Sequence, residues 1–556
     1  MQDPSDKPPT PVLVARDPRA PLPAHGLGTP PAEEADEAEV RAAIQLLEWL
    51  DADQARVMAL DDELRKRLLM AAGKVARPGR DDRKRRVKEE RRARRRDKRD
   101  ADEAQLNATG IRRKRDEPVY VTPRAPAMLM GSAVGALPDP DAAPAFPPDG
   151  PDAEAAAADG PRVQEARVCY VCKAEYEQLH HFYDQLCPAC GDFGFAKRSQ
   201  TADLRGRVVL ITGARVKIGY QAAIILLRAG ARVIVTTRFP RDAAARFARE
   251  EDFDDFRERL EVHGLDLRHT PSVEIFAQHL SEHLPTLDFI VHNACQTVRR
   301  PPGFYAHLVS GERESTPLSA EAESLVSAHE AWKRADSADA LATRGEVPQL
   351  LEAAGIHHAA ALTQVPLVAG DHDRSAALFP PDELDKDLQQ RDLRDQNSWR
   401  LTLAEVPTVE LLEVQLVNAI APFVLNARLK ALMTRTRTGD KHIVNVSAME
   451  GQFYRAFKTD KHPHTNMAKA ALNMMTRTSA IDYVRDGIHM NSVDTGWVSD
   501  EDPVGLAAYK QVVHRFHPPL DIVDGAARIV DPILHGVNTG EHVWGQFLKD
   551  YRSIPW

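Results

Sequence analysis

Apolar positions divide the chain into an N-terminal part with helical spacing and a C-terminal part in which short apolar runs alternate with helical segments. Between Glu37 and Met70, apolar residues recur at steps of three, four and seven residues, which is typical of one apolar helical face. We therefore expect two helices, or one bent helix, in this segment. Residues 1–36 are rich in Pro, Ala and acidic side chains, so we expect them to be disordered.

The alternation in the C-terminal part begins with two strand-like runs. Val208–Ile211 and Ala231–Thr237 are apolar and rich in β-branched residues, and the helical run Ile218–Arg228 lies between them. Strands that alternate with helices in this way form parallel sheets with both faces covered. The sequence therefore predicts an α/β fold over residues 204–556, built on a doubly wound parallel sheet.

A long interruption follows the strand-like run Leu287–His292. More than a hundred residues separate this run from the helix that begins near Val409, whereas a compact α/β unit needs only a short loop there. We predict an insertion at about residues 300–405. Because it follows the carboxyl end of a strand, where ligands bind in open α/β sheets, part of it could act as a lid. A partly disordered surface excursion is the alternative.

Length and composition indicate a soluble protein with two or more folded parts, since the chain has 556 residues and a charged fraction of 28%. The N-terminus lacks a secretory signal pattern, and no run approaches the ~18 apolar residues that span a bilayer. We therefore expect a cytoplasmic protein with no membrane partner. Residues 118–165 are rich in Pro and Ala and are predicted to form a linker.

The formal net charge of −9 conceals a basic run. Within the helical and Arg-rich segment 37–117, Arg77–Arg99 holds 14 Lys and Arg against 5 Asp and Glu. Such a run can bind nucleic acid or direct nuclear import, but it is more often a solvated charged segment. No aromatic residue interrupts it to stack on a base, so we expect nucleic-acid binding to be auxiliary at most.

Four of the five cysteines form two Cys-x-x-Cys pairs separated by 14 residues: Cys169, Cys172, Cys187 and Cys190. Two residues between cysteines let both sulfurs reach one ion at ~2.3 Å, and four thiolates close a tetrahedral site that serves folding and docking. The spacing predicts a structural Zn²⁺ module over residues 166–200. Replacement of one sulfur by His180 or His181 is an alternative, although packing roles are more typical for them; a redox role is another.

The turn after the first strand has the features of a dinucleotide cradle. Its residues are Thr212, Gly213, Ala214, Arg215, Val216, Lys217, Ile218 and Gly219. Backbone N–H groups and the helix dipole at such a helix start favour a pyrophosphate. Gly213 permits the tight turn, and Gly219 lets the strand and the helix pack closely. Two glycines alone are a weak signal, and the following strand–helix alternation strengthens it.

With four further motifs in the same order, the chain resembles the short-chain dehydrogenase/reductase family, a Rossmann-fold group, over roughly residues 206–556 without the insertion. The further motif residues are Asp266 with Leu267, Asn293 in His-Asn-Ala-Cys, Asn418, and Ser447. The resemblance implies that the loop and Asn293 hold a nicotinamide coenzyme, with Asp266 and Leu267 beside its adenine. It also implies that Ser447 polarises a substrate oxygen and that Asn418 supports the proton route.

The resemblance fails at the catalytic tyrosine. The family's Tyr-x-x-x-Lys corresponds to Thr465-Asn-Met-Ala-Lys469, in which Lys469 is implied to hold the nicotinamide ribose. An aliphatic hydroxyl has a pKa well above the ~10 of tyrosine, so Thr465 cannot take over acid–base work at neutral pH. Tyr454 and His464 are candidate substitutes. Adjacent helical residues point in different directions, which disfavours His464, while an ordinary rim or packing role explains Tyr454 equally well.

Charge at the end of the second strand bears on the choice of coenzyme. An NAD-selective site places a carboxylate there, whereas this strand ends in Thr236-Thr237-Arg238. Arg238, Arg215 and Lys217 would supply positive charge to a 2′-phosphate, so NADP is favoured and NAD is the alternative. Solvated surface cations would explain the same residues without a coenzyme.

Two functions from different classes follow. The first is an NADP-dependent oxidoreductase that acts on an unidentified carbonyl or alcohol substrate, with Tyr454 as a non-standard proton donor. The second is a catalytically inactive NADP(H)-binding sensor or scaffold, which reports to a protein partner through the zinc module, the insertion or the N-terminal region. Thr465 favours the second, whereas Asn418, Ser447 and Lys469 together favour the first. A homo-oligomer and a nuclear location, the latter because of the Arg-rich run, also remain open.

Overall fold

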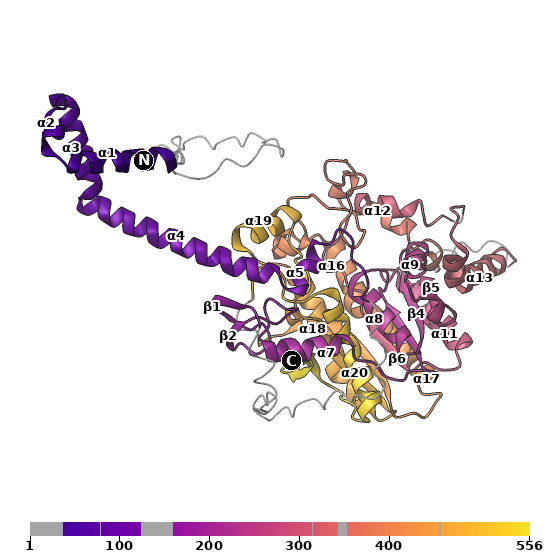
Figure 1. The fold of residues 1–556 in the computed structure, drawn as a ribbon. Helices are drawn as coiled ribbons and strands as arrows, with labels where there is room; N and C mark the ends of the chain where they lie inside the picture. The colour runs from indigo at the N-terminus through magenta and orange to yellow at the C-terminus, as the bar shows by residue number, and fades with distance from the viewer. Residues whose placement is uncertain (1–36, 78, 124–159, 314, 343–352, 455–457) are drawn as a thin grey trace, which may run out of the picture. The chain divides into compact units, whose positions relative to one another are not determined.

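The computed structural model describes residues 37–77, 79–123, 160–313, 315–342, 353–454 and 458–556 (Figure 1). The disorder predicted for residues 1–36 and the central part of the predicted linker, 124–159, fall outside these described residues. The chain divides into two compact units, Met1–Arg96 and Asp97–Trp556. The large sheet belongs to the second unit.

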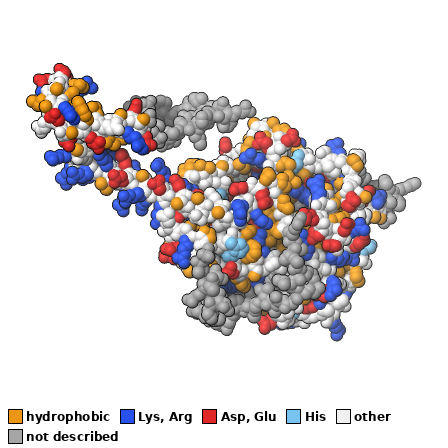
Figure 2. Space-filling model, in the orientation of Figure 1, with side chains coloured by type: hydrophobic (Ala, Val, Ile, Leu, Met, Phe, Trp, Pro, Cys, Tyr) orange, Lys and Arg blue, Asp and Glu red, His pale blue; other side chains and the backbone are white. Residues whose placement is uncertain are grey.

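The first unit is helical in its described part. Helices α1 (Glu37–Asp51), α2 (Gln54–Met58) and α3 (Asp62–Ala76) follow one another, and α4 (Arg80–Asn107) begins in this unit. Asp53 caps α2 by accepting a hydrogen bond from the Ala55 N–H, and Asp61 caps α3 in the same way. The two caps explain why the periodic segment forms three helices. Basic side chains follow α4 along its exposed length (Figure 2).

Eight strands form the sheet of the second unit, in the order β10-β9-β8-β7-β6-β3-β4-β5. Their bounds are β3 Val208–Thr212, β4 Arg232–Thr237, β5 Leu260–Gly264, β6 Phe289–His292, β7 Lys441–Ser447, β8 Ile488–Asp494, β9 Phe547–Lys549 and β10 Arg552–Ile554. All pairings are parallel except that of β9 with β10. The predicted doubly wound parallel sheet is confirmed.

Both faces of the sheet are covered by helices. On β3, Val209 and Ile211 join one apolar core while Val208 and Leu210 join the other, because alternate side chains point to opposite faces. The first core includes α8 (Lys217–Arg228), α9 (Pro240–Phe247), α10 (Phe253–Phe256) and α20 (Ile522–Thr539); the second includes α11 (Thr270–His283), α17 (Ala421–Met433) and α18 (Pro463–Val484). This double burial explains why the central strand β3 is almost wholly apolar.

One apolar stretch exceeds what the sequence pattern suggested. Thr408–Met433, which comprises α16 (Thr408–Gln415), the π-helical turn η6 (Leu416–Ile420) and α17, is long and apolar enough to cross a membrane. The expectation that no run approaches this length is therefore wrong. The stretch serves as a core helix, because Leu425, Leu429 and Leu432 lie fully buried against the sheet.

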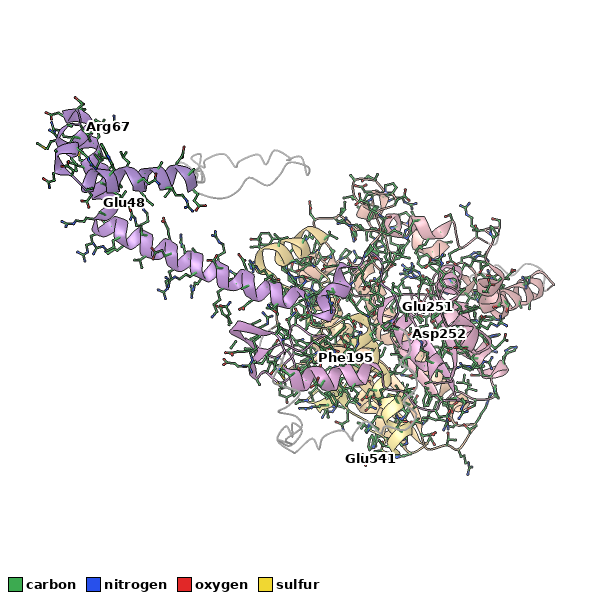
Figure 3. The ribbon with its side chains drawn as sticks, viewed as in Figure 1. Glu48, Arg67, Phe195, Glu251, Asp252 and Glu541 are labelled. Carbon is green, nitrogen blue, oxygen red and sulfur yellow. The ribbon has the colours of Figure 1, made fainter. Side chains whose placement is uncertain are left out.

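The cysteine-bearing segment forms a small module beside the sheet. It consists of the hairpin β1 (Arg162–Val168) and β2 (Glu175–Gln178) and of α7 (Pro188–Arg198), which carries Phe195 (Figure 3). Its apolar core includes Ile111 from α5 (Gly110–Asp116) and Leu520 from the far end of the chain. Since β1 begins at Arg162, the module starts inside the segment predicted as a linker up to residue 165. The linker boundary was therefore placed too late.

The described part of the insertion is folded and packs beside the carboxyl end of β4. It contains α12 (Pro302–Val309), α13 (Ala320–Ala342), α15 (Ala354–His357) and short 3₁₀ helices at Ala361–Gln364, Ala369–His372, Ser398–Arg400 and Leu403–Glu405. Phe304, Tyr305 and Phe379 pack on Phe239, which directly follows β4. A buried Arg299 guanidinium joins Asp371 at 2.6 and 2.7 Å and Glu413 at 3.0 Å. This part of the insertion thus forms a cap beside the ends of β4 and β5, and its action as a lid stays a prediction.

Substituting Arg299 by Met should destabilise this cap strongly, because the buried Asp371 carboxylate would lose its cation and Glu413 would keep only Arg268. We expect a loss of about 3–5 kcal/mol in the free energy of unfolding, measured by urea denaturation. Arg300→Met is the matched control, since its partner Asp392 keeps Arg394 at 2.7 Å, and we expect it to lose less than about 1 kcal/mol. Equal losses in the two variants would contradict this account.

Candidate functional site

The loops that follow β3 and β6 meet closely. Asn293 donates a side-chain hydrogen bond to the Gly213 carbonyl at 2.9 Å, and the Ala294 N–H donates to the Thr212 hydroxyl at 3.2 Å. A Cβ on Gly219 would lie 2.2 Å from the Asn293 side-chain nitrogen, so only glycine fits there. Gly213 has a φ of +72°, which glycine adopts without strain. Neither glycine has room for a Cβ, because the loop after β6 lies against both of them. The predicted coenzyme loop requires such close packing.

Lys217 and Arg215 behave differently from the phosphate-binding cations expected at this loop. Lys217 has a φ of +57°, so its backbone keeps the left-handed conformation that suits the family's glycine. Its ammonium lies 4.0 Å from the Asp387 carboxylate of the insertion. Arg215 is buried, and pairs with Asp242 at 2.8 Å and Gln389 at 3.2 Å. Arg215 is therefore occupied by protein groups, while Ile218 is the second residue of α8, which begins at Lys217.

Arg238 lies at the end of β4, where the sequence placed it. Its guanidinium donates to the Tyr305 hydroxyl at 2.6 Å, and its centre lies 4.6 Å from the Tyr305 ring centroid. Among the described residues, Arg238 makes no ion pair with a carboxylate. The Arg238 guanidinium, at the carboxyl end of β4, could therefore bind a phosphate if the Tyr305 hydroxyl moved away from it.

Asp266 is engaged within the protein. It is 1% exposed and pairs with Arg268 at 2.6 Å, and Arg268 also reaches Glu413 at 2.8 Å. Burial works to raise the pKa of Asp266, but the Arg268 cation outweighs it and the pKa is lowered. Leu267 is buried in the second core. An adenine at this position would meet a carboxylate that is already neutralised.

Four predicted active-site residues come together in the interior. Asn418, Ser447, Thr465 and Lys469 are 1%, 3%, 2% and 4% exposed, and α18, which carries the last two, contacts both β7 and η6. The Lys469 ammonium donates to the Val446 carbonyl at 2.7 Å, directly beside Ser447. The four residues thus lie on adjoining elements, and their catalytic and coenzyme-binding roles stay predictions.

The Asn418 side chain has hydrogen-bond partners, whereas the Ser447 and Thr465 hydroxyls have none among the described residues. The Asn418 side chain accepts from the Gln296 N–H at 2.8 Å and donates to the Gln296 carbonyl at 3.3 Å, so it holds the loop after β6. The Ser447 and Thr465 hydroxyls are buried, and neither has a hydrogen-bond partner among the described residues. Since an unpaired buried hydroxyl costs about 1–3 kcal/mol, two of them together indicate a place for a ligand atom.

The structure does not bring Tyr454 into this group. Tyr454 is 81% exposed, on the chain that leaves the 3₁₀ helix η7 (Met449–Gly451). Its hydroxyl therefore lies on the surface, whereas Ser447 is enclosed. The segment that was expected to follow the active-site rim turns outward after Gly451, which itself packs tightly on the Lys469 backbone.

His464 faces another buried group that sequence reasoning missed. Its Nε2 lies 3.5 Å from a Glu410 carboxylate oxygen on α16, and both residues are buried. The available signal was an acidic side chain inside the apolar helical run Thr408–Gln415, where charge is unusual unless it is partnered. His464 therefore belongs to a contact between α16 and α18, as its direction on the helix suggested.

The segment after β8 forms the wall on the other side of Ser447. Asp494 lies opposite Ser447 in the strand register, and its carboxylate accepts hydrogen bonds from the Met449 and Gly496 N–H groups, both at 3.1 Å. Lys549 pairs with Asp494 at 3.0 Å. Burial works to lower the pKa of Lys549, but Asp494 and Asp550 outweigh it and raise the pKa. The ion pair between Asp494 and Lys549 thus fixes the chain at the end of β8.

The four cysteines meet as predicted. All four sulfur atoms lie within 4.8 Å of one another, and those of Cys172 and Cys187 are 3.7 Å apart. A tetrahedral ion with thiolates at ~2.3 Å requires sulfur separations of about 3.8 Å, so the donor set fits. His180 is not a donor, since its Nδ1 accepts from the Phe182 and Tyr183 N–H groups at 3.0 and 3.2 Å. The packing interpretation of His180 is therefore the better one.

Comparisons with known proteins agree with these motifs. The family model for short chain dehydrogenases matches residues 207–306, and the model for enoyl-(acyl carrier protein) reductases matches residues 398–518, on either side of the insertion. Uncharacterized protein R665 of Acanthamoeba polyphaga mimivirus is 30% identical over 400 residues, which are 69% of this chain and 74% of that protein. Dehydrogenase/reductase SDR family member 13 of Homo sapiens is 36% identical over 109 residues, or 19% of this chain and 26% of that protein.

Two solved structures align with part of this chain. The Pseudomonas aeruginosa RhlG/NADP active-site complex is 18% identical, with a TM-score of 0.37, and the match covers 62% of this chain and 95% of that one. The carbonyl reductase Sniffer of Drosophila melanogaster is 14% identical, with a TM-score of 0.37 and coverages of 63% and 99%.

Replacing Lys217 by Gly should stabilise the protein, because a left-handed backbone costs a residue with a Cβ about 1–2 kcal/mol. We expect Lys217→Gly to unfold with about 1 kcal/mol more free energy than Lys217→Ala, which loses the same amine but keeps the Cβ. Denaturant titration of both variants measures the difference. If the alanine variant is as stable as the glycine variant, the strain assigned to Lys217 is absent.

Proposed function

Because the chain belongs to the short-chain dehydrogenase/reductase family, we propose that it is an NADP-dependent oxidoreductase that acts on a carbonyl or alcohol substrate. The observation that carries this proposal is the pair of buried, unpaired hydroxyls of Ser447 and Thr465 beside Lys469. A protein that only bound the coenzyme would have no need for two unsatisfied hydroxyls at the reacting end of the site.

The coenzyme fits the residues that would hold it. The cradle of Gly213 and Gly219 excludes side chains from the place where backbone must approach a pyrophosphate. Arg238 favours a 2′-phosphate, since no carboxylate at the end of β4 would repel it. When bound, NADPH supplies the hydride. Lys469 would then exchange the Val446 carbonyl for the nicotinamide ribose, as the family resemblance implies.

Ser447, Thr465 and Lys469 stabilise the developing charge and supply the proton in this proposal. Ser447 donates a hydrogen bond to the substrate carbonyl oxygen, which stabilises the negative charge that grows there as the carbonyl carbon is reduced. The product alkoxide takes the proton of the Thr465 hydroxyl while that oxygen takes one from the Lys469 ammonium. An ammonium is a stronger acid than an aliphatic alcohol, so it can protonate an alkoxide through such a relay, and Thr465 need not ionise by itself.

We also propose that the four cysteines bind a structural Zn²⁺. The support is the 3.7 Å separation of the Cys172 and Cys187 sulfurs and the mutual proximity of all four thiols. A site with four thiolates has no open position for substrate, so this ion would hold the module together and take no part in hydride transfer.

The rival function is a redox-inactive NADP(H)-binding sensor. Thr465 in place of tyrosine and the exposed side chain of Tyr454 favour it, because neither is a conventional acid within the site. Tight NADPH binding without turnover on a broad panel of ketones, aldehydes and alcohols would support the sensor and reject the oxidoreductase.

Arg238→Ala should weaken NADPH binding by about 10- to 100-fold, which corresponds to the ~1.5–3 kcal/mol of hydrogen bonds to a charged group. NADH binding should not change, because NADH lacks the 2′-phosphate. Arg232→Ala is the matched control, since Arg232 lies at the start of the same strand and pairs with Glu261. Coenzyme fluorescence titration measures both affinities. Equal losses for NADPH and NADH would show that Arg238 does not read the phosphate.

Turnover should depend on the Thr465 hydroxyl. We expect Thr465→Val, which keeps the shape but removes the hydroxyl, to lower kcat about 100-fold, and Thr465→Ser to stay within a few-fold of the wild type. Ser447→Ala should lower kcat/KM to a similar extent. Tyr454→Phe should have no effect. The measurement is NADPH oxidation at 340 nm with a carbonyl substrate found by screening. Normal turnover by Thr465→Val, or a large loss in Tyr454→Phe, would exclude the relay.

A further inference from the structure

The segment Trp497–Leu520, here called the lid segment, leaves the sheet at the active-site edge. It begins shortly after Asp494, the register partner of Ser447, and it carries α19 (Val504–His514). None of the α19 residues is buried, and Val512 is 79% exposed. A helix with so little packing has low local stability, so its position depends on what holds its ends.

The two ends of the lid segment meet each other. The Leu520 N–H donates to the Trp497 carbonyl at 3.2 Å, which closes the segment into a loop with one narrow base. On its outer side the segment contacts the insertion, where the Asn397 side chain donates to the Glu501 carbonyl at 2.8 Å. The base of this loop is therefore one of the contacts that place α19, together with Asn397 and with Arg515, which follows α19 and pairs with Asp100 of α4.

The first end is held by the cysteine module. Tyr170 lies between Cys169 and Cys172, and its hydroxyl accepts a hydrogen bond from the Trp497 N–H at 3.0 Å. The same hydroxyl lies 3.4 Å from the Lys549 ammonium, which pairs with Asp494. Tyr170 thus connects the start of the lid segment, at Trp497, to the Lys549–Asp494 ion pair beside Ser447.

The second end is held by the same module and by α5. Gln185, two residues before Cys187, donates to the His517 carbonyl, and Arg115 donates to the Leu520 carbonyl at 3.1 Å. The Leu520 side chain is fully buried in the module's apolar core, which includes Cys169 and Leu186. Both ends of the lid segment are therefore anchored on residues next to the cysteine ligands.

We propose that the cysteine module is a metal-dependent clamp for the lid segment, with Tyr170 as its main positioning residue. A divalent ion that joins the two Cys-x-x-Cys pairs fixes the distance between Tyr170 and Gln185, because each lies within two residues of a ligand. Loss of the ion frees the two anchors to move apart and opens the base of the lid segment. This inference rests on the proposed function for its effect on substrate, since the clamp would set substrate affinity and leave hydride transfer itself unchanged.

Hydrogen exchange of the full chain tests the clamp without any substrate. Tyr170→Phe removes the hydroxyl and keeps the ring and all four cysteines, so metal content should not change. We expect exchange across residues 497–520, and first at the Trp497 amide, to become about 5- to 10-fold faster, as the loss of one hydrogen bond allows. Chelation of the metal should accelerate exchange over the same residues. Unchanged exchange at 497–520 in both arms would overturn the clamp.

Tyr176→Phe is the matched control, because Tyr176 belongs to the same module but its hydroxyl donates to the Asp184 carbonyl at 3.0 Å, away from the lid segment. It should leave exchange at 497–520 unchanged. If turnover is found, Tyr170→Phe should raise KM about 5- to 10-fold with kcat maintained. Faster exchange at 497–520 without turnover in any variant would keep the clamp and reject the oxidoreductase, so the two failures are distinguishable. Equal acceleration by Tyr170→Phe and Tyr176→Phe would reduce Tyr170 to a general structural role and overturn the proposal.

Discussion

The close contact between the loops after β3 and β6 is the constraint on which the site depends. Asn293 reaches the Gly213 carbonyl only because Gly219 has no side chain. This contact aligns the carboxyl ends of the central strands, and helices bury both faces of the sheet. The one edge left for a ligand is therefore the edge at which Ser447 ends β7 and Asp494 ends β8.

The segments that pack at this edge of the sheet neutralise one another's charges. The insertion neutralises Arg299 with Asp371 and brings Tyr305 to Arg238. Arg215 is buried against Asp242, so a loop that looks rich in cations presents few of them. Several cations at this edge are thus already paired with carboxylates within the protein, whereas the partner of Arg238 is a neutral phenol, which can leave without exposing a buried carboxylate.

Local patterns predicted the parts of this structure that depend on local spacing. The alternation of apolar runs with helical segments predicted the parallel sheet, the Cys-x-x-Cys spacing predicted the sulfur cluster, and the motif at Thr465 and Lys469 predicted a shared helix face. Pairs far apart in sequence carried no such signal, as with Asp494 and Lys549, which are 55 residues apart, or Arg238 and Tyr305, which are 67 apart. Tyr454 was misplaced for the same reason. Non-periodic chain after Gly451 gives no information on direction, and the fold turns it outward.

The packing of the cysteine module against the C-terminal part of the chain also constrains the order in which the protein can fold during synthesis. Arg198 pairs with Asp521 across 323 residues, and the module's apolar core needs Leu520. A ribosome that adds about 5–20 residues per second reaches that partner between roughly 15 and 65 seconds after the module emerges. During synthesis the apolar face and the thiols of the module are exposed to solvent until α20 has been made. Early binding of a metal ion by the nascent chain would protect the thiols during this time.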